Sequence, residues 1–270
     1  AANIATALDL LRLAEMFEAQ GDYLVPNRVK KGVEARYPLG TWVPDRKGEG
    51  ISDKDIAARR AVYIDGDAVR DAGDGPVRGI SASTKEASMS IGVVLDVADL
   101  YGSILGDEDA LGFGMSGNGG HLHIATEDLD PEASEPLVKD LLSVTAALFD
   151  TKEVKIDTSV TDAKRIAPAF GTTKRKANST KERPWRRTWF VAPAVAGGRP
   201  VRRLTIQDLK MLVAELRRKL TPEQVVALEA ASKPKAGSSP RPTTIPKIGA
   251  DLFKQANAIP YADVMSRLGM

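Results

Sequence analysis

Two aspartates stand two positions apart at the end of a short apolar run, Val-Tyr-Ile-Asp-Gly-Asp, which covers residues 62–67. Side chains alternate along a strand, so we expect Asp65 and Asp67 on the same side of it. Neighbouring carboxylates repel each other unless a cation lies between them, and Mg²⁺ and Mn²⁺ prefer oxygen ligands. The pair is therefore a candidate metal site, although a strand that runs into an Asp-Gly turn has the same sequence.

A third carboxylate, Asp157, ends the apolar run Val-Lys-Ile at residues 154–156. If that run is a strand of the same sheet, Asp157 can join Asp65 and Asp67 around one or two divalent metals. Metals of this kind polarise phosphate groups and align an attacking hydroxyl. The three acids therefore favour phosphoryl or nucleotidyl transfer, with Mg²⁺ or Mn²⁺ as the cofactor.

A glycine-rich turn, Ser-Gly-Asn-Gly-Gly-His, covers residues 116–121. Glycines let the backbone approach a ligand closely and let successive amide groups point at an anion. His121 can then donate to a phosphate oxygen, and His123 is expected on the same face of the strand. For His123 an ordinary packing role is the favoured interpretation. The turn matches neither the Walker nor the Rossmann pattern.

Nine Lys and Arg residues against one acid lie between positions 164 and 187, and two tryptophans, Trp185 and Trp189, lie near the end of this segment. Basic residues interleaved with aromatic ones suit a phosphate-rich partner with bases to stack on. A solvated basic loop is the alternative. The expected contacts with DNA are Arg175, Arg183, Trp185, Arg186 and Arg187.

Bulk composition limits the function classes. The chain has 270 residues, 43% of them apolar, which is ample for one large domain and a smaller appendage. The absence of cysteine excludes disulfides, Cys-bound zinc and thiol catalysis, and two histidines are too few for a His-rich metal site. No run of about 18 apolar residues occurs, so we expect no membrane partner and a cytoplasmic location. The chain begins without Met, and we expect it to be part of a longer protein.

Strands and helices mix without regular alternation, which predicts an α+β fold. The pattern predicts strands over 62–67, 111–124 (a strand-turn-strand unit) and 152–159. Ser83 and Glu86 have the spacing of a capping box at a helix start. The expected helices cover 4–20, 51–60, 83–105, 131–149, 204–219, 222–231, 251–257 and 261–268, with a linker near 232–247.

Taken in order, these segments resemble the three motifs of the archaeo-eukaryotic primase superfamily. The first comprises the acid pair with Arg70 and the segment from Gly79 to Glu86. The second is the turn that ends in His121. The third starts at Asp157 and continues through the basic segment to Pro184. The resemblance covers roughly residues 60–190 and is closest to the primase-polymerases of phages, plasmids and other mobile elements.

The resemblance implies a template-dependent DNA primase-polymerase that transfers nucleotides from dNTP or NTP to a 3′-hydroxyl or an initiating nucleotide. It implies a two-layer catalytic core with an RRM-like antiparallel sheet over residues 1–200, followed by a small helical region over 201–270. The catalytic, metal-binding acids would be Asp65, Asp67 and Asp157. The nucleotide ligands would be Ser116, Asn118, Gly119, His121, Arg165, Lys174 and Lys176.

Three departures from the family pattern stand out. Gly66 replaces the usual apolar residue between the two acids. Residues 167–170 read Ala-Pro-Ala-Phe where relatives often have an Arg-Leu-Pro-like run. The zinc-bound stem of the archaeal and eukaryotic small subunits is missing, because the chain has no cysteine.

Two other functions remain open at this point. Acid clusters serve hydrolysis equally well, so a metal-dependent nuclease or phosphotransferase is the enzymatic alternative. A non-catalytic single-strand or origin DNA-binding replication module is the other. The segment from Leu204 to Ala231 either packs on the catalytic domain or grips the template. The expected partners of the protein are single-stranded DNA and a helicase domain or replication partner beyond the C-terminus.

Overall fold

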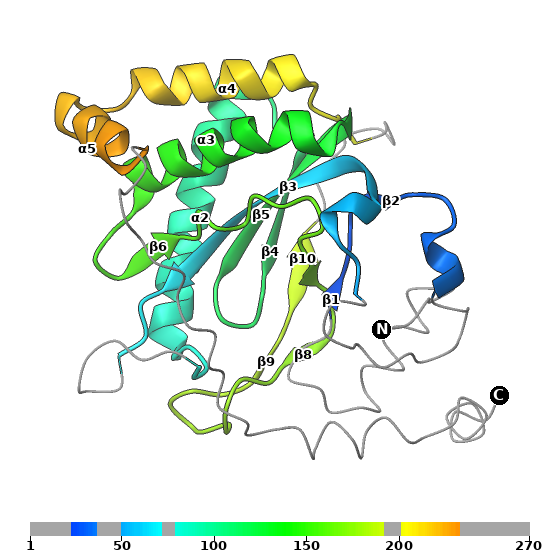
Figure 1. The fold of residues 1–270 in the computed structure, drawn as a ribbon. Helices are drawn as coiled ribbons and strands as arrows, with labels where there is room; N and C mark the ends of the chain where they lie inside the picture. The colour runs from blue at the N-terminus through cyan, green and yellow to red at the C-terminus, as the bar shows by residue number, and fades with distance from the viewer. Residues whose placement is uncertain (1–22, 37–49, 72–78, 192–200, 233–270) are drawn as a thin grey trace, which may run out of the picture.

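The computed structural model describes residues 23–36, 50–71, 79–191 and 201–232. Within these ranges the chain is an α+β protein, in which long helices pack on an antiparallel sheet (Figure 1). The helix expected over 4–20, the linker expected near 232–247 and the helices expected over 251–257 and 261–268 lie outside the described residues.

The sheet is organised around one long strand, β3 (Ile56–Ala68). On one side β3 pairs with β5 (Gly120–Leu129), which pairs in turn with β4 (Leu111–Met115), and β4 pairs with β10 (Trp189–Val191). β3 also pairs with β2 (Arg28–Val29) near its start and with β6 (Val154–Ile156) near its end. All of these pairs are antiparallel.

The helix expected over 51–60 is wrong. Ser52 caps only a short 3₁₀ turn (Asp53–Asp55), and the chain enters β3 at Ile56. Two ladders hold this segment extended, because Ala58 pairs with Arg28 and Arg59 pairs with Leu129. A capping signal fixes where a turn begins but not how far it continues, and here the pairing with two neighbouring strands decides the structure.

The strand-turn-strand unit and the helix expected over 131–149 are confirmed, the helix as α3 (Pro131–Phe149). With α2 (Thr84–Leu105), the chain follows the order β3-α2-β4-β5-α3-β6. Asp65 pairs with His121 of β5, and its carbonyl accepts from the Asp157 amide (2.8 Å). β5 and β6 therefore lie on opposite edges of β3. The strand order β6-β3-β5-β4 is that of a ferredoxin-like split βαβ unit.

One face of this sheet forms the core and the other carries the polar side chains. Val62, Ile64, Leu122 and Ile124 are buried in one apolar cluster with residues of α2 and α3. Because side chains alternate along a strand, Asp65 and Asp67 lie on the opposite face.

The expected capping box of α2 is present: the Ser83 side chain accepts from the Glu86 amide, and the Glu86 carboxylate accepts from the Ser83 amide. Gly106 ends the helix in a left-handed conformation. By length and composition alone α2 could cross a membrane, as core helices often could. Its buried residues Val94, Val97 and Tyr101 belong to the main core of the described fold.

The C-terminal helices α4 (Ile206–Arg218) and α5 (Pro222–Ser232) are also confirmed. α4 lies along α3 (Figure 1), and its side chains Leu209, Leu212 and Leu216 are buried in the same cluster as the sheet. Leu204 extends the sheet, because its amide donates to Ala125 and its carbonyl accepts from Glu127. The first of the two alternatives therefore holds for α4, which packs on the rest of the fold.

Two small ladders complete the described structure. β1 (Tyr23–Leu24) pairs with β7 (Ala167–Pro168), and β8 (Thr173–Lys174) pairs with β9 (Arg186–Arg187). The segment between β8 and β9 lies within the Lys- and Arg-rich segment 164–187. We call residues 173–187 the basic hairpin.

Candidate metal and nucleotide site

The structure brings the three predicted acids together. Asp65 and Asp67 lie on the face of β3 opposite the apolar core, and Asp157 follows β6, whose register sets Gly66 opposite Ile156. One carboxylate oxygen from each of the three acids lies within 4.8 Å of the other two. Three convergent carboxylates are a donor set that suits a hard divalent cation.

The electrostatics of Asp67 agree with this fit. Burial raises the pKa of Asp67, and the negative charge of Asp65 adds to the effect, with Asp157 contributing as well. Burial also acts on Asp65, but the charges of His121 and Arg70 outweigh it and lower the pKa of Asp65, so the repulsion is expressed at Asp67. A bound cation would relieve it, so the residues present fit a hard divalent cation.

His121 faces the acid pair from the neighbouring strand. It stands opposite Asp65 in the register, and its Nε2 lies 3.0 Å from Asp65 Oδ1. Burial lowers the pKa of His121, but the charge of Asp65 and the hydrogen bond outweigh burial and the net direction is upward. The other ring nitrogen, Nδ1, is buried and has no hydrogen-bond partner among the described residues.

His123 shares the face of His121 but has different surroundings. Its ring packs against Tyr63 (centroids 4.5 Å apart), Phe170 (5.2 Å) and Phe190 (5.0 Å). Burial, with the nearby His121 charge, lowers the pKa of His123 to about 3. His123 is therefore a neutral member of an aromatic cluster, as the favoured interpretation of the sequence had it.

The glycine-rich turn is held in place by its own polar groups. The Ser116 amide donates to the Gly119 carbonyl (2.9 Å), and the Ser116 hydroxyl also reaches this carbonyl (3.2 Å). Asn118 is buried and accepts from the Ala82 amide (2.8 Å), which fixes the turn to the segment before α2. Asn118 thus has a clear anchoring role, and its role as a nucleotide ligand stays a prediction.

Two of the predicted cations lie within electrostatic reach of the acids. Arg165 acts on Asp65, and Lys176 acts on both Asp65 and Asp67. Burial lowers the pKa of Lys176, and a nearby cation, Arg70, lowers it further. The charges of Asp67 and Asp65 oppose this effect. Lys174 is placed differently, with its Nζ 4.3 Å from the centre of the Tyr23 ring.

Two arginines of the basic hairpin anchor it to α2. Both terminal nitrogens of Arg183 bind the Glu86 carboxylate (2.6 and 2.9 Å), and they also donate to the carbonyls of Ser81 and Asp71. Arg186 donates to the Ala82 carbonyl (2.7 Å) and to other groups nearby. Both guanidinium groups are engaged within the protein, so their DNA contacts remain predictions.

Three other side chains of the hairpin are more open. Arg175 lies with its guanidinium carbon 5.9 Å from the centre of the Trp185 ring, and 40% of Trp185 is exposed. The indole N–H donates to the Ala177 carbonyl (2.9 Å), which fixes the ring. Arg187 is exposed, with its Nε bonded to the Gly171 carbonyl. An exposed, fixed ring beside cations is able to stack a nucleobase.

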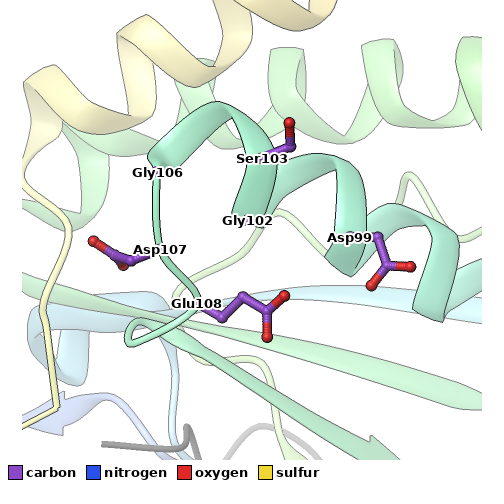
Figure 2. A pocket seen from close by; sticks show the side chains of 6 residues that line it. All are labelled: Asp99, Gly102, Ser103, Gly106, Asp107 and Glu108. Atoms are coloured by element: carbon purple, nitrogen blue, oxygen red, sulfur yellow. The ribbon is translucent and has the colours of Figure 1, made fainter. Parts of the chain in front are cut away.

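A surface hollow of about 540 Å³ lies at the C-terminal end of α2 (Figure 2). None of the residues that line it belongs to the acid cluster. Its lining is formed by the last turns of α2 and the loop after it. Asp107 in this lining is paired with Arg202 (2.5 Å). The lining residues are Asp99, Gly102, Ser103, Gly106, Asp107 and Glu108.

The sequence-based reasoning left two residues at the site without a role. Arg70 lies three positions after Asp67, and its Nη2 is 3.4 Å from the Asp67 carboxylate. Ser90, on α2, donates to the Gly66 carbonyl between the two acids and accepts from the Gly120 amide in the glycine-rich turn. The spacing of Arg70 from the acids was a usable signal, whereas a serine inside a helix carries none.

Comparison of the chain with protein-family models, with curated proteins and with solved structures gives no match. The function is therefore inferred from the geometry of the site and from the motif resemblance.

Proposed function

We propose that this chain is a metal-dependent nucleotidyltransferase of the primase-polymerase type. The observation that carries the proposal is the convergence of Asp65, Asp67 and Asp157 beside His121 on the face of the sheet opposite the apolar core. The three acids come from two strands more than eighty residues apart, and their meeting at one point is what catalysis on a phosphate would require.

The acids would hold Mg²⁺ or Mn²⁺. A metal bound there supplies Lewis-acid polarisation of the phosphate and a lowered pKa of the attacking hydroxyl. The protein's own contribution is to hold the three carboxylates at one point. The Asp157 amide binds the Asp65 carbonyl (2.8 Å), and the Asp157 carboxylate accepts from the Ser159 amide (2.8 Å).

The cations and His121 would hold the triphosphate of a dNTP or NTP. Nε2 of His121 faces Asp65 and its Nδ1 is buried without a partner, so Nδ1 would donate to a phosphate oxygen once the groups that cover it move aside. Arg165 and Lys176 would add positive charge, because Arg165 acts electrostatically on Asp65 and Lys176 acts on Asp67. Oriented donors and cations of this kind stabilise the charge that develops as pyrophosphate leaves.

The fold and the basic hairpin support a nucleic-acid substrate. The ferredoxin-like strand order is shared with RRM-like sheets, which is the core that the primase resemblance implies. Arg175, Trp185 and Arg187 would contact a single-stranded DNA template. A helicase domain or replication partner joined beyond the C-terminus belongs to the same proposal, as does a role in replication of DNA from a mobile element, in the cytoplasm.

A primer-extension gel tests the proposal. A 5′-labelled primer on a longer template is incubated with dNTPs and Mg²⁺ or Mn²⁺, with the parent and with an Asp65→Asn/Asp67→Asn variant. Asp96→Asn, which alters an exposed carboxylate on α2, is the matched control. We expect lengthened primers with the parent and the control and none with the double variant.

The same gel separates the alternatives. Reactions without nucleotides reveal a nuclease, because only a nuclease shortens the labelled strand. A parent that neither lengthens nor shortens the primer, and that starts no chain on an unprimed template, would refute the enzymatic proposal and leave the DNA-binding module.

A further inference from the structure

The ladder between β3 and β5 stops at the acid site. Its last pair is Asp65 with His121, and no pair of Gly66 with Gly120 follows, although on their other edges Gly66 pairs with Ile156 and Gly120 with Met115. The two strands therefore part where Asp67 and the glycine-rich turn begin. Without a further link, the distance between Asp67 and His121 would depend on two separate strand ends.

A hydroxyl group from α2 occupies this point. The Ser90 Oγ donates to the Gly66 carbonyl (2.5 Å) and accepts from the Gly120 amide (2.8 Å). Ser90 is fully buried, so loss of its hydroxyl would leave two buried backbone groups without this partner. One side chain thus takes the place of the missing strand pair and links both strands to the helix.

The glycines around Ser90 make this close approach possible. A Cβ on Gly66 would lie 2.6 Å from Val94 Cγ2, and a Cβ on Gly119 would lie 2.7 Å from Ser90 Oγ. Larger residues would push α2 away from the strand ends. This accounts for Gly66 between the two acids, where the resembling family has an apolar residue.

We propose that Ser90 is a positioning residue that sets the separation of Asp67 from Asp65 and His121, and with it the affinity of the acid cluster for a divalent cation. The proposal rests on the proposed metal site. Ser90 does not face the ligand itself, because it lies on the helix side of the sheet. It acts through the backbone at Gly66, the residue between the two acids, as groups behind a metal ligand commonly do.

The test compares Mn²⁺ affinity in two variants that each lose one buried hydroxyl. Ser90→Ala removes the link, whereas Thr145→Val removes the hydroxyl that binds Tyr101 (2.5 Å) between α3 and α2, away from the acids. Both should unfold at lower urea concentrations than the parent. Electron paramagnetic resonance of free Mn²⁺ measures affinity without any nucleotide or activity.

We expect Ser90→Ala to bind Mn²⁺ about tenfold more weakly than the parent, as is typical when a group that supports a metal ligand is removed. Thr145→Val should bind Mn²⁺ within about twofold of the parent. Ser90→Cys, with a weaker donor of similar size, should fall between parent and Ala and serves if Ser90→Ala does not fold. Equal affinity in the parent and a folded Ser90 variant would overturn the positioning role. A parent that binds no Mn²⁺ would instead refute the metal site.

Discussion

The pair of Glu86 and Arg183 offers a prediction whose size follows from the structure. Burial raises the pKa of Glu86, but the hydrogen bond from Arg183 and those from the amides of Ser83 and Asp71 outweigh it and lower the pKa to about 2 from 4.5. At about 1.4 kcal/mol per pKa unit, the ionised carboxylate contributes about 3 kcal/mol to the free energy of unfolding. Partial exposure of both side chains makes this an upper value.

Glu86→Gln removes the charge but keeps an oxygen that can accept from the Ser83 amide. We expect it to lower the free energy of unfolding by about 2 to 3 kcal/mol at pH 7, since Arg183 is then left without its carboxylate. The folded-state pKa lies below the unfolded value. The contribution is therefore complete above about pH 4.5 and is lost as the pH falls toward 2.

Urea unfolding at pH 7, 5, 4 and 3 measures this directly. The stability gap between parent and Glu86→Gln should stay constant down to about pH 5 and shrink below it. Glu132→Gln, an exposed first-turn glutamate of α3, should change stability by about 0.5 kcal/mol or less. A gap that is equally large at pH 7 and pH 3 would refute the ion-pair explanation.

Two further predictions concern α2 and the basic hairpin. Gly66→Ala should lower the free energy of unfolding by about 1 to 3 kcal/mol in urea titrations, because its Cβ would meet a Val94 methyl at 2.6 Å. The control, Gly92→Ala on the exposed side of α2, should raise the free energy of unfolding by about 0.5 to 1 kcal/mol. Destabilisation by both substitutions would contradict the packing account. Trp185→Ala should weaken single-stranded DNA binding in fluorescence anisotropy by about 1 to 3 kcal/mol through lost base stacking, and Arg187→Ala should reduce the salt dependence of binding. Unchanged affinity and salt slope would remove the hairpin from the interface.

Local signals were sufficient for much of the fold. The capping box of Ser83 and Glu86 placed the start of α2, and the glycine-rich turn placed the strands on either side of it. The two-residue spacing of Asp65 and Asp67 put both on one face, as the alternation of a strand requires. These features depend on neighbours within a few residues, so they can be predicted from the sequence.

Features that depend on distant contacts were beyond the sequence. Ile56 begins a strand only because β2 and β5 pair with it. The sequence predicts Arg183 as a DNA contact, but in the structure both of its terminal nitrogens bind Glu86, almost a hundred residues earlier in the chain. Ser90 gains its role from two backbone groups on separate strands. Asp157 was predicted to join the acids from its place at the end of the apolar run 154–156, but the pairing of that strand with β3 is a distant contact that the sequence does not show.

Asp157 is therefore the residue that tests the central claim most directly. It reaches the acid pair only through the pairing of β6 with β3, and it serves no described ion pair. The measurement is nucleotide incorporation on a primed template by the parent, Asp157→Asn and Asp96→Asn, with equal folding checked by circular dichroism. We predict incorporation by the parent and Asp96→Asn and a loss of at least about a hundredfold with Asp157→Asn, in line with the several kcal/mol that metal assistance provides. Full activity of a folded Asp157→Asn variant would contradict the proposed metal-dependent site.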